Sequence, residues 1–461
     1  MLLKPWLNHY DSGVPESINY PVLPLDNLLI HAAHKNPKQT AVIFANADGR
    51  SLAAAKYSYK EITTAVYQFA AGLQQLGIRK GNRVAIMLPN SPQFIIAINA
   101  IWRLGGIAVC AESRYATRNL EEILLDSGSE MMITTEKVAQ RVEKNWDKLP
   151  LDRVIVTNVE DYLPWQTKRV TLSTSPLTQI FRPGTETISR IPFSKVSSKD
   201  TAKLKLIEVS SIDTAVILYS HIRASRLVGV QLTHRNLVSN ATAVNAWCHN
   251  SALDRRLAVV PFSNAFSLTV ALNTGILNGD TLVILHNLLR PEQITQAIKQ
   301  YHINILPATP AMLTHLAAQS QIHDKAFSSL QKIISSGPLP PKVYARFSTL
   351  PDTQITEIFG RPETSAVVTM NPLHNRKPQA LGIPLPDTSI MIADADLGTN
   401  ELPLGEIGEI IVRGPQIMQS YWRQPGTASQ YLRVGPDGEH GWYFTGHYGY
   451  MDEDGFLYLS E

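Results

Sequence analysis

The stretch 218–237, "LYSHIRASRLVGVQLTHRNL", carries the two ends of a nucleotide-binding loop. An apolar strand would end at Tyr219 and Ser220, and Gly229 leads toward a predicted helix. Loops that wrap phosphates need small residues, because glycine lets backbone N–H groups turn onto phosphate oxygens at positive φ. The middle of this stretch, "HIRASR", is instead bulky and basic. The ends therefore indicate phosphate chemistry, and the middle argues against it.

Two interpretations of the middle are open. In one, Arg223 and Arg226 act as phosphate clamps, because a guanidinium binds a phosphate through two N–H groups at once. In the other, the stretch is a plain strand-to-helix connection without a ligand. We favour the plain connection, because side chains do not easily reproduce a cradle of backbone N–H groups. A β-branched Ile222 at positive φ would also cost on the order of 1–3 kcal/mol.

The composition is that of a globular chain with several folding units. At about 150 residues per domain, 461 residues predict two or three units. Hydrophobic residues make up 44% of the chain, which is enough for sizeable cores and argues against disorder. The net charge of +3 is too small to argue for a nucleic-acid partner.

Cysteines and apolar runs bear on the compartment. Cys110 and Cys248 each lie inside an apolar stretch, which is neither a disulfide framework nor a metal site and fits a reducing compartment. The N-terminus shows no signal-peptide pattern, and the longest apolar stretch, "FIIAINAIW", falls well short of a membrane span. We expect a soluble cytoplasmic protein.

Strands alternate with helices along most of the chain. The segment "SYKEITTAVYQFAAGLQQLG" predicts a helix, because Ser58 and Glu61 form a capping box and Gly77 ends the apolar periodicity. The same run continues with "RVAIMLP", a helix after Ser91, "GIAVCA", "TRNLEEILLDSG" and "EMMITT". The alternation resumes with "TAVILYS", a helix after Thr233, "RLAVVP", "DTLVIL", "PEQITQAIKQY" and "INILPA". We therefore expect two parallel, doubly wound sheets in an α/β fold.

The chain divides into three predicted units. Residues 166–206 are rich in Ser, Thr and Pro, which predicts a long irregular connection that closes a first α/β subdomain, 1–206. A second α/β subdomain covers 207–375. The pattern then changes to short strands and turns, which predicts a small β-rich unit, a distorted barrel, over 376–461.

Several motifs together resemble the adenylate-forming superfamily of acyl-CoA synthetases, fatty acyl-AMP ligases and firefly luciferase. The most specific are "GEIGEIIVRGPQIMQSYWRQP" and "TGHYGYMDEDGFLYL". The stretches "VGVQLTHRNL", "FGRPETSAVVTMNP" and "KPWLNHYDSGVPESINYP" resemble bacterial long-chain fatty acyl-CoA ligases in particular. The resemblance covers essentially the whole chain. It implies two α/β subdomains and a distorted β-barrel, with the active site where they meet, a fatty acid as substrate, and ATP with magnesium as cofactors.

The chain departs from the family's phosphate loop, which reads roughly Thr-Ser-Gly-Thr-Thr-Gly-x-Pro-Lys-Gly. Aligned without a gap, the loop glycines fall on Ile222 and Ser225, and the lysine falls on Val228. Ser220 and Gly229 are the residues of this chain that match the family's phosphate loop. The candidates for nucleotide binding in this loop are Ser220, Arg223, Ser225 and Arg226.

Other site positions also depart from the family. His447 stands where the resemblance implies an aspartate that accepts both ribose hydroxyls, and a neutral histidine offers one acceptor. Pro362 stands where the family has a threonine. Gly337 lies in "SSGPLPP", which is one small residue short in the turn beside the adenine. Asn264 stands where fatty acyl ligases usually have histidine, and we take Asn264 and Phe266 as candidates for the acyl pocket.

Two positions match the family. Glu363 falls on the magnesium-binding glutamate, and Phe359, followed by Gly360, falls on the aromatic that stacks against adenine. The alternative for Glu363 is an acid in a solvated loop, and the alternative for Phe359 is an aromatic ring of the core. The sequence stops at Glu461, where the resemblance implies a hinge to a smaller domain that carries the adenylating lysine. We expect that C-terminal lysine-bearing domain to be absent.

Three functions compete. The leading hypothesis is a degenerate acyl-CoA ligase homologue, without ATP-dependent activation on its own, that binds an acyl ligand or a partner protein. The alternative is an active acyl-AMP-forming ligase domain that a missing or separate C-terminal domain completes. The third, a membrane-surface protein, rests on the basic stretch 168–196, whose spacing gives no clear amphipathic helix. We do not favour that third hypothesis.

Overall fold

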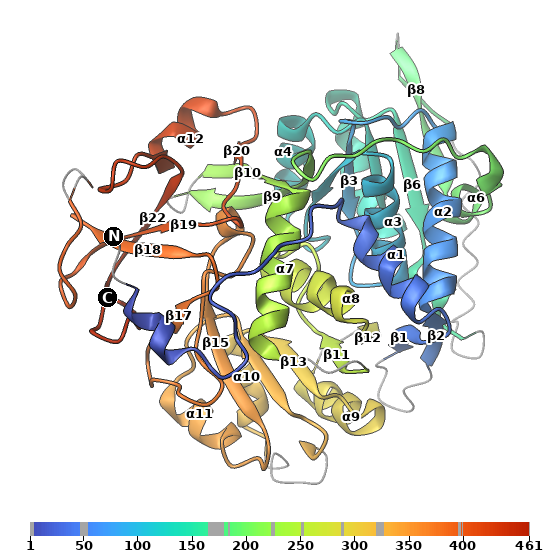
Figure 1. Ribbon diagram of the computed structural model, residues 1–461. Coiled ribbons are helices and arrows are strands. Elements are labelled where there is room, and N and C mark those ends of the chain that lie inside the picture. The colour runs from blue at the N-terminus through green and yellow to red at the C-terminus, as the bar shows by residue number, and fades with distance from the viewer. Residues whose placement is uncertain are drawn as a thin grey trace.

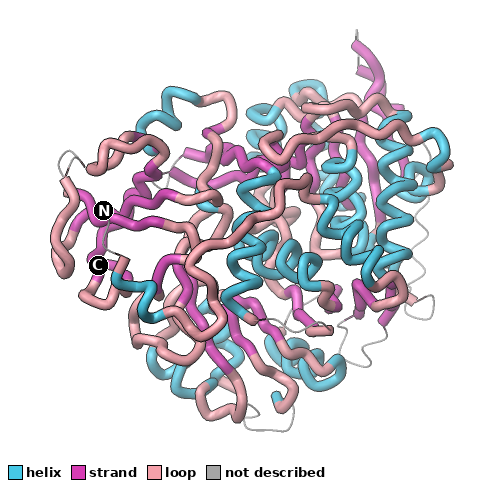
Figure 2. Tube along the Cα trace, in the orientation of Figure 1, coloured by secondary structure: helices cyan, strands magenta, loops and turns pink. Residues whose placement is uncertain are grey.

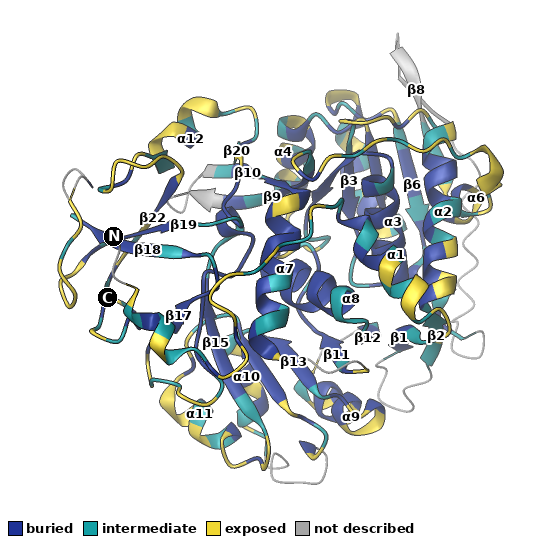
Figure 3. Ribbon diagram, viewed as in Figure 1, coloured by how far each residue is buried: buried dark blue, intermediate teal, exposed yellow. Residues whose placement is uncertain are grey.

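The computed structural model describes residues 4–46, 54–164, 179–182, 185–222, 226–249, 253–286, 290–319, 327–394, 398 and 400–460. Two large sheets lie beside each other, with helices α7 and α8 between them (Figure 1). A smaller antiparallel sheet packs at one end, and Figure 2 shows strands dominating that end while helices surround the two large sheets. Buried residues follow the large sheets and the helices between them (Figure 3).

The first large sheet has the strand order β17-β16-β15-β14-β13-β11-β12-β1-β2. Its strands are β1 (Thr40–Asn46), β2 (Ala54–Ser58), β11 (Arg255–Ala258), β12 (Thr281–His286), β13 (Ile305–Ala308), β14 (Lys332–Ser335), β15 (Gln354–Phe359), β16 (Thr369–Met370) and β17 (Ile383–Pro384). The central pairs are parallel, whereas β1–β2, β15–β16 and β16–β17 are antiparallel. The sheet is therefore mixed.

The second large sheet has the order β20-β10-β9-β4-β3-β5-β6-β8-β7. Its strands are β3 (Arg83–Met87), β4 (Ile107–Cys110), β5 (Met131–Thr135), β6 (Arg153–Thr157), β7 (Gln179–Arg182), β8 (Thr185–Pro192), β9 (Thr214–Ile222), β10 (Arg226–Thr233) and β20 (Ser420–Tyr421). The pairs β4–β9, β3–β4, β3–β5, β5–β6 and β6–β8 are parallel, whereas β7–β8, β9–β10 and β10–β20 are antiparallel.

The third sheet is an antiparallel half-barrel in the C-terminal part of the chain. It consists of β18 (Ser389–Ala393), β19 (Gly408–Arg413), β21 (Leu432–Arg433), β22 (Trp442–Met451) and β23 (Leu457–Leu459). The predicted fold class, two α/β sheets followed by a β-rich barrel-like unit, is confirmed, with the refinement that both large sheets are mixed.

The helices separate and cover the sheets. The α-helices are α1 (Asp26–Lys35), α2 (Tyr59–Gln75), α3 (Pro92–Arg103), α4 (Thr117–Ser127), α5 (Glu136–Val142), α6 (Phe193–Ser197), α7 (His234–Cys248), α8 (Thr274–Asn278), α9 (Pro291–Tyr301), α10 (Pro310–Ala317), α11 (Pro341–Phe347) and α12 (Pro425–Tyr431). The 3₁₀-helices are η1 (Pro5–His9), η2 (Glu143–Lys148), η3 (Val159–Tyr162), η5 (Thr201–Lys203) and η9 (Pro362–Thr364), and η6 (Ser267–Asn273) is a π-helix. In the described parts of the chain, no helix combines the length and hydrophobicity that crossing a bilayer requires.

Local sequence signals set the helix starts. The predicted capping box at α2 is present, because Ser58 and Glu61 each satisfy the other's backbone N–H. Helix α7 begins in the same way, with the Thr233 hydroxyl accepting from the N–H of Asn236 while the Asn236 amide oxygen accepts from Thr233 N–H. These exchanges fix where each helix begins.

Two sequence predictions need correction. Residues 166–206 were expected to be irregular, but 179–182 and 185–192 form the strands β7 and β8, and β8 pairs in parallel with β6. The Ser, Thr and Pro content suggested a loop, whereas the threonines and isoleucines of "TETISRIP" are good strand formers. The two sheets also do not divide at residue 206, since β9 and β10 complete the sheet of the N-terminal half. The proposed domain boundaries remain a prediction.

Helix α7 also carries a buried histidine at its first position. The backbone N–H of Leu25 donates to Nδ1 of His234 at 3.0 Å, which ties the N-terminal segment to the space between the large sheets. His234 is fully buried. Burial lowers the pKa of His234 to about 4, and the nearby Asp213 offsets only part of that effect. The neutral ring is therefore the form that the fold uses.

We predict that His234 makes the protein less stable in mild acid. Because its folded pKa lies below the unfolded value, the unfolded state binds a proton first, and stability is lost as pH falls below about 6.5 toward 4. Between pH 7 and pH 5 the free energy of unfolding should fall by about 2 kcal/mol on account of this group. Urea unfolding at the two pH values measures it.

The matched control is His234→Asn, which keeps an acceptor for Leu25 N–H but does not titrate. Its free energy of unfolding should change less between the two pH values. An equal fall in both proteins would show that His234 is not the group responsible.

Candidate functional site

The predicted phosphate loop is the tip of a β-hairpin, and this corrects the expectation of a strand-to-helix connection. Strands β9 and β10 pair along their whole length, as far as Ile222 opposite Arg226. The residues that follow Thr233, not those of the loop, start the helix. Arg223 and Ser225 lie outside the described residues, as does the side chain of Arg226.

The described part of this hairpin faces the core. Val228, at the position of the family's lysine, is fully buried, and Ser220 is buried opposite it. A Cβ at Gly229 would lie 2.8 Å from Cγ2 of Ile217, so a close approach of side chains requires this glycine. Gly229 therefore fits the packing of the strand and gives no evidence for a phosphate.

Glu363 lies in the short turn η9, and its carboxylate is fully buried. Its Oε2 lies 3.3 Å from Nε of Arg361, and its Oε1 accepts from the hydroxyl of Tyr421 at 3.2 Å. Burial and the charge of Glu363 raise the pKa of Tyr421, so the phenol keeps the proton that it donates. The alternative of a solvated loop acid is therefore wrong.

His447 lies on β22 and bonds to the same arginine as Glu363. The Nη1 of Arg361 donates to Nε2 of His447 at 2.8 Å. Burial, followed by the charge of Arg361, lowers the pKa of His447, so the neutral ring accepts this bond. The ring meets Phe359 edge to face at 5.8 Å between centroids. The predicted ribose position, His447, thus contacts both the predicted adenine position, Phe359, and Arg361.

Arg361 was missed in the sequence and is the centre of this cluster. Burial alone would lower the pKa of its guanidinium, but the charge and hydrogen bond of Glu363, together with Tyr443 and Tyr421, more than offset burial and the pKa is raised. The backbone N–H of Arg361 donates to Oγ1 of Thr364 at 2.9 Å, which fixes the start of η9. The available signal was a cation between the glycine and proline of "FGRPE", directly beside the predicted metal ligand. We call Tyr421, Glu363, Arg361, His447 and Phe359 the Arg361 cluster.

The two candidate glycines have different surroundings. A Cβ at Gly360 would lie 1.9 Å from the carbonyl oxygen of Ala366, so the fold itself requires glycine there. Gly337 has room, with Pro310 as the nearest contact at 3.6 Å, and its carbonyl accepts from the Ser335 hydroxyl at 2.7 Å. Neither glycine by itself indicates a nucleotide.

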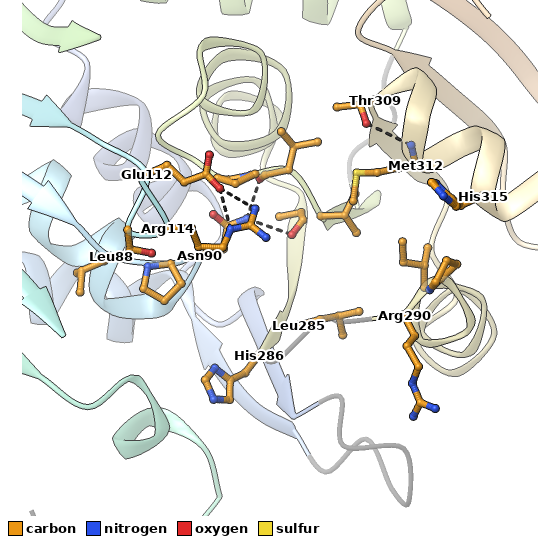
Figure 4. A pocket seen from close by; sticks show the side chains of 18 residues that line it. Leu88, Asn90, Glu112, Arg114, Leu285, His286, Arg290, Thr309, Met312 and His315 are labelled. Atoms are coloured by element: carbon orange, nitrogen blue, oxygen red, sulfur yellow. Dashed lines mark hydrogen bonds and ion pairs between the residues drawn. The ribbon is translucent and has the colours of Figure 1, made fainter. Parts of the chain in front are cut away.

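A cavity of about 820 Å³ opens near the C-terminal ends of strands from both large sheets. Open α/β sheets bind ligands at this edge. The cavity is lined by Leu88, Pro89, Asn90, Glu112, Ser113, Arg114, Ala258, Val259, Val260, Pro261, Leu285, His286, Arg290, Pro291, Ile294, Thr309, Met312 and His315 (Figure 4). Most of these side chains are apolar, which suits an apolar ligand with a small polar group.

Polar groups of the cavity come from separate elements. Glu112 and Arg114 form an ion pair at 2.6 Å, and Asn90 donates to the carbonyls of residues 258 and 260, which joins the two sheets (Figure 4). His286 lies 3.4 Å from Glu160, but burial still lowers the pKa of His286.

The acyl-pocket candidates do not line this cavity. Asn264 is exposed and accepts from the backbone N–H of Phe266 at 2.9 Å, while Phe266 is buried. The cavity wall is made instead by the preceding residues, 258–261. A role for Asn264 and Phe266 in acyl binding stays a prediction. Within the described residues, no group of three or more His, Cys, Asp or Glu side chains is arranged to hold a metal ion.

The chain is similar to a large set of known proteins. The family model described as "AMP-binding enzyme" matches residues 29–422. The long-chain-fatty-acid–CoA ligases of Bacillus subtilis and Salmonella typhimurium are each 30% identical over 99% of this chain and 80% of their own length. The crystal structure of a long-chain-fatty-acid-CoA ligase from Archaeoglobus fulgidus superimposes with a TM-score of 0.83 at 25% identity, covering 98% of this chain and 86% of that chain.

We predict that His447→Asp alone will not create a nucleotide site. The resemblance implies an aspartate at this position, but the nearest donor here is Nη1 of Arg361, which would pair with the new carboxylate. Calorimetry with ATP and magnesium should therefore show no low-micromolar binding by the variant. The double variant Arg361→Ser/His447→Asp is the comparison, because it leaves the carboxylate without that partner. Low-micromolar binding by His447→Asp alone would contradict the prediction.

Proposed function

We propose that this chain, which belongs to the AMP-binding enzyme family, binds a fatty acyl ligand but does not activate it with ATP. It is a homologue of the long-chain fatty acid CoA ligases. ATP-dependent activation requires a place for the phosphates, and a ligand-binding role requires a cavity.

The observation that carries the proposal is the antiparallel pairing of β9 with β10, the strands on either side of the predicted phosphate loop. Backbone groups within an antiparallel ladder bond across the two strands, so they do not turn together onto an anion. The pairing runs as far as Ile222 and Arg226. The position that aligns with the family's lysine is a fully buried Val228, which brings no charge to a phosphate.

The Arg361 cluster supports the same conclusion. The groups at the predicted ribose and magnesium positions, His447 and Glu363, both bond to Arg361. A nucleotide would have to replace these contacts. Because a hydrogen bond to a charged group contributes about 1.5–3 kcal/mol, losing two such contacts weakens nucleotide binding by several decades.

The cavity supports the ligand part of the proposal. Its volume of about 820 Å³ lies within the range of small-molecule sites, and apolar residues such as Leu285, Ile294 and Met312 line it. Arg114, Arg290 and His315 provide cationic or hydrogen-bonding groups for an anionic end. A carboxylate with an apolar chain matches both features.

The first test is calorimetry of the unmodified protein with ATP and magnesium. We expect no binding in the micromolar range, because the paired strands β9 and β10 and the Arg361 cluster use their hydrogen-bonding groups among themselves. A low-micromolar dissociation constant would contradict the proposal and favour the alternative, an active ligase domain with altered loop chemistry. Pyrophosphate release with medium- to long-chain fatty acids then tests turnover.

The second test fills the cavity with Met312→Trp. Met312 is half-buried on α10 and lines the cavity, so a larger ring should exclude an acyl chain while the helix persists. We expect the affinity for cis-parinaric acid, measured by fluorescence, to fall about tenfold or more, which corresponds to about 1.4 kcal/mol.

The matched control is Thr314→Trp on the exposed side of the same helix. It should leave the affinity unchanged. Equal affinity of both variants, with unchanged melting temperatures, would place the ligand elsewhere, and no binding by the unmodified protein would contradict the proposed acyl ligand.

A further inference from the structure

We propose that Arg361 is an internal counterion that takes the place of a divalent metal ion at Glu363. The inference rests on the proposed function and deepens it, because it names the residue that keeps the predicted metal position closed. It concerns a cation that the chain itself supplies.

The first observation is that Glu363 is a fully buried carboxylate. An isolated buried charge is strongly unfavourable, so this carboxylate needs a cation or several donors. Among the ion pairs of the described residues, its partner is Arg361, at 3.3 Å, and a second donor is the Tyr421 hydroxyl. Each carboxylate oxygen therefore already has a partner from the chain.

The second observation is that the guanidinium of Arg361 is held at both ends. Its Nε faces Glu363 and its Nη1 donates to His447, while its backbone N–H and carbonyl bond to Thr364. The side chain is mostly buried, with 23% exposed. Arg361 is therefore a fixed part of the site and not a mobile surface cation.

These contacts do not fit a bound magnesium ion. Mg²⁺ requires oxygen ligands in a near-octahedral arrangement, and a site beside Glu363 would place it next to a guanidinium of the same sign. Neutral His447 is engaged by the arginine as well. Arginine and metal therefore compete for one carboxylate, and this chain supplies the arginine.

The test is whether a metal ion can replace the arginine. Arg361→Gln leaves Glu363 buried without its cation, which should lower the melting temperature by roughly 5 °C or more. With about 10 mM MgCl₂ or MnCl₂ the variant should recover at least half of that loss, because an ion that binds only the folded state stabilises it. The unmodified protein should show no such rise.

Two controls separate metal binding at Glu363 from a general salt effect. Arg361→Lys keeps a cation near the carboxylate and should not respond to the metal ion. Arg361→Gln/Glu363→Gln has no carboxylate and should not respond either. A salt such as NaCl at matched ionic strength sets the baseline for all variants.

Three outcomes would overturn the inference: a metal-dependent rise in the unmodified protein that Glu363→Gln abolishes, no rise in a destabilised Arg361→Gln, or an Arg361→Gln variant that fails to fold in both media. In the last case the metal cannot replace the arginine. The melting experiment contains no nucleotide, so its outcome is separate from that of the ATP calorimetry.

Discussion

A buried carboxylate is the constraint around which the predicted nucleotide site is arranged. Glu363 has no exposed surface, so its charge must be neutralised by groups that the fold brings to it. Arg361 comes from the same turn, whereas Tyr421 comes from β20. The backbone N–H of Met418 also donates to the Glu363 carbonyl oxygen at 2.8 Å. These contacts therefore also fasten the segment between β19 and β21 of the half-barrel onto the α/β core.

The same arrangement separates two kinds of binding. The polar groups of the Arg361 cluster bond to one another, so few of their donors and acceptors are left for a charged ligand. The cavity between the large sheets keeps its volume, its apolar walls and several polar side chains at its surface. A chain with this pattern can lose affinity for a nucleotide and still retain a place for an apolar ligand, because none of the residues of the Arg361 cluster lines the cavity.

Local signals in the sequence predicted much of the fold, whereas contacts between segments that are distant in the sequence could not be predicted. The capping box at Ser58 and the helix start at Thr233 depend on neighbouring residues, so they were visible. The strand β8 lay in a segment whose composition suggested a loop. Glu363 was found by its motif, but its burial and its bond to Arg361 depend on how β15, β20 and β22 meet. No spacing within the chain encodes that meeting.

The exchange of strands between the two large sheets has a consequence for how the chain reaches this fold. Strand β1 pairs with β12, and Thr281 donates to the carbonyl of Thr40 across 241 residues of chain. During synthesis, β1 and β2 can pair with each other, but β1 lacks its second partner, β12, until the intervening segments have emerged from the ribosome. Such a high contact order favours slow folding and leaves unpaired edges exposed for a time. A chaperone that covered this edge of β1 would protect it until β12 is available.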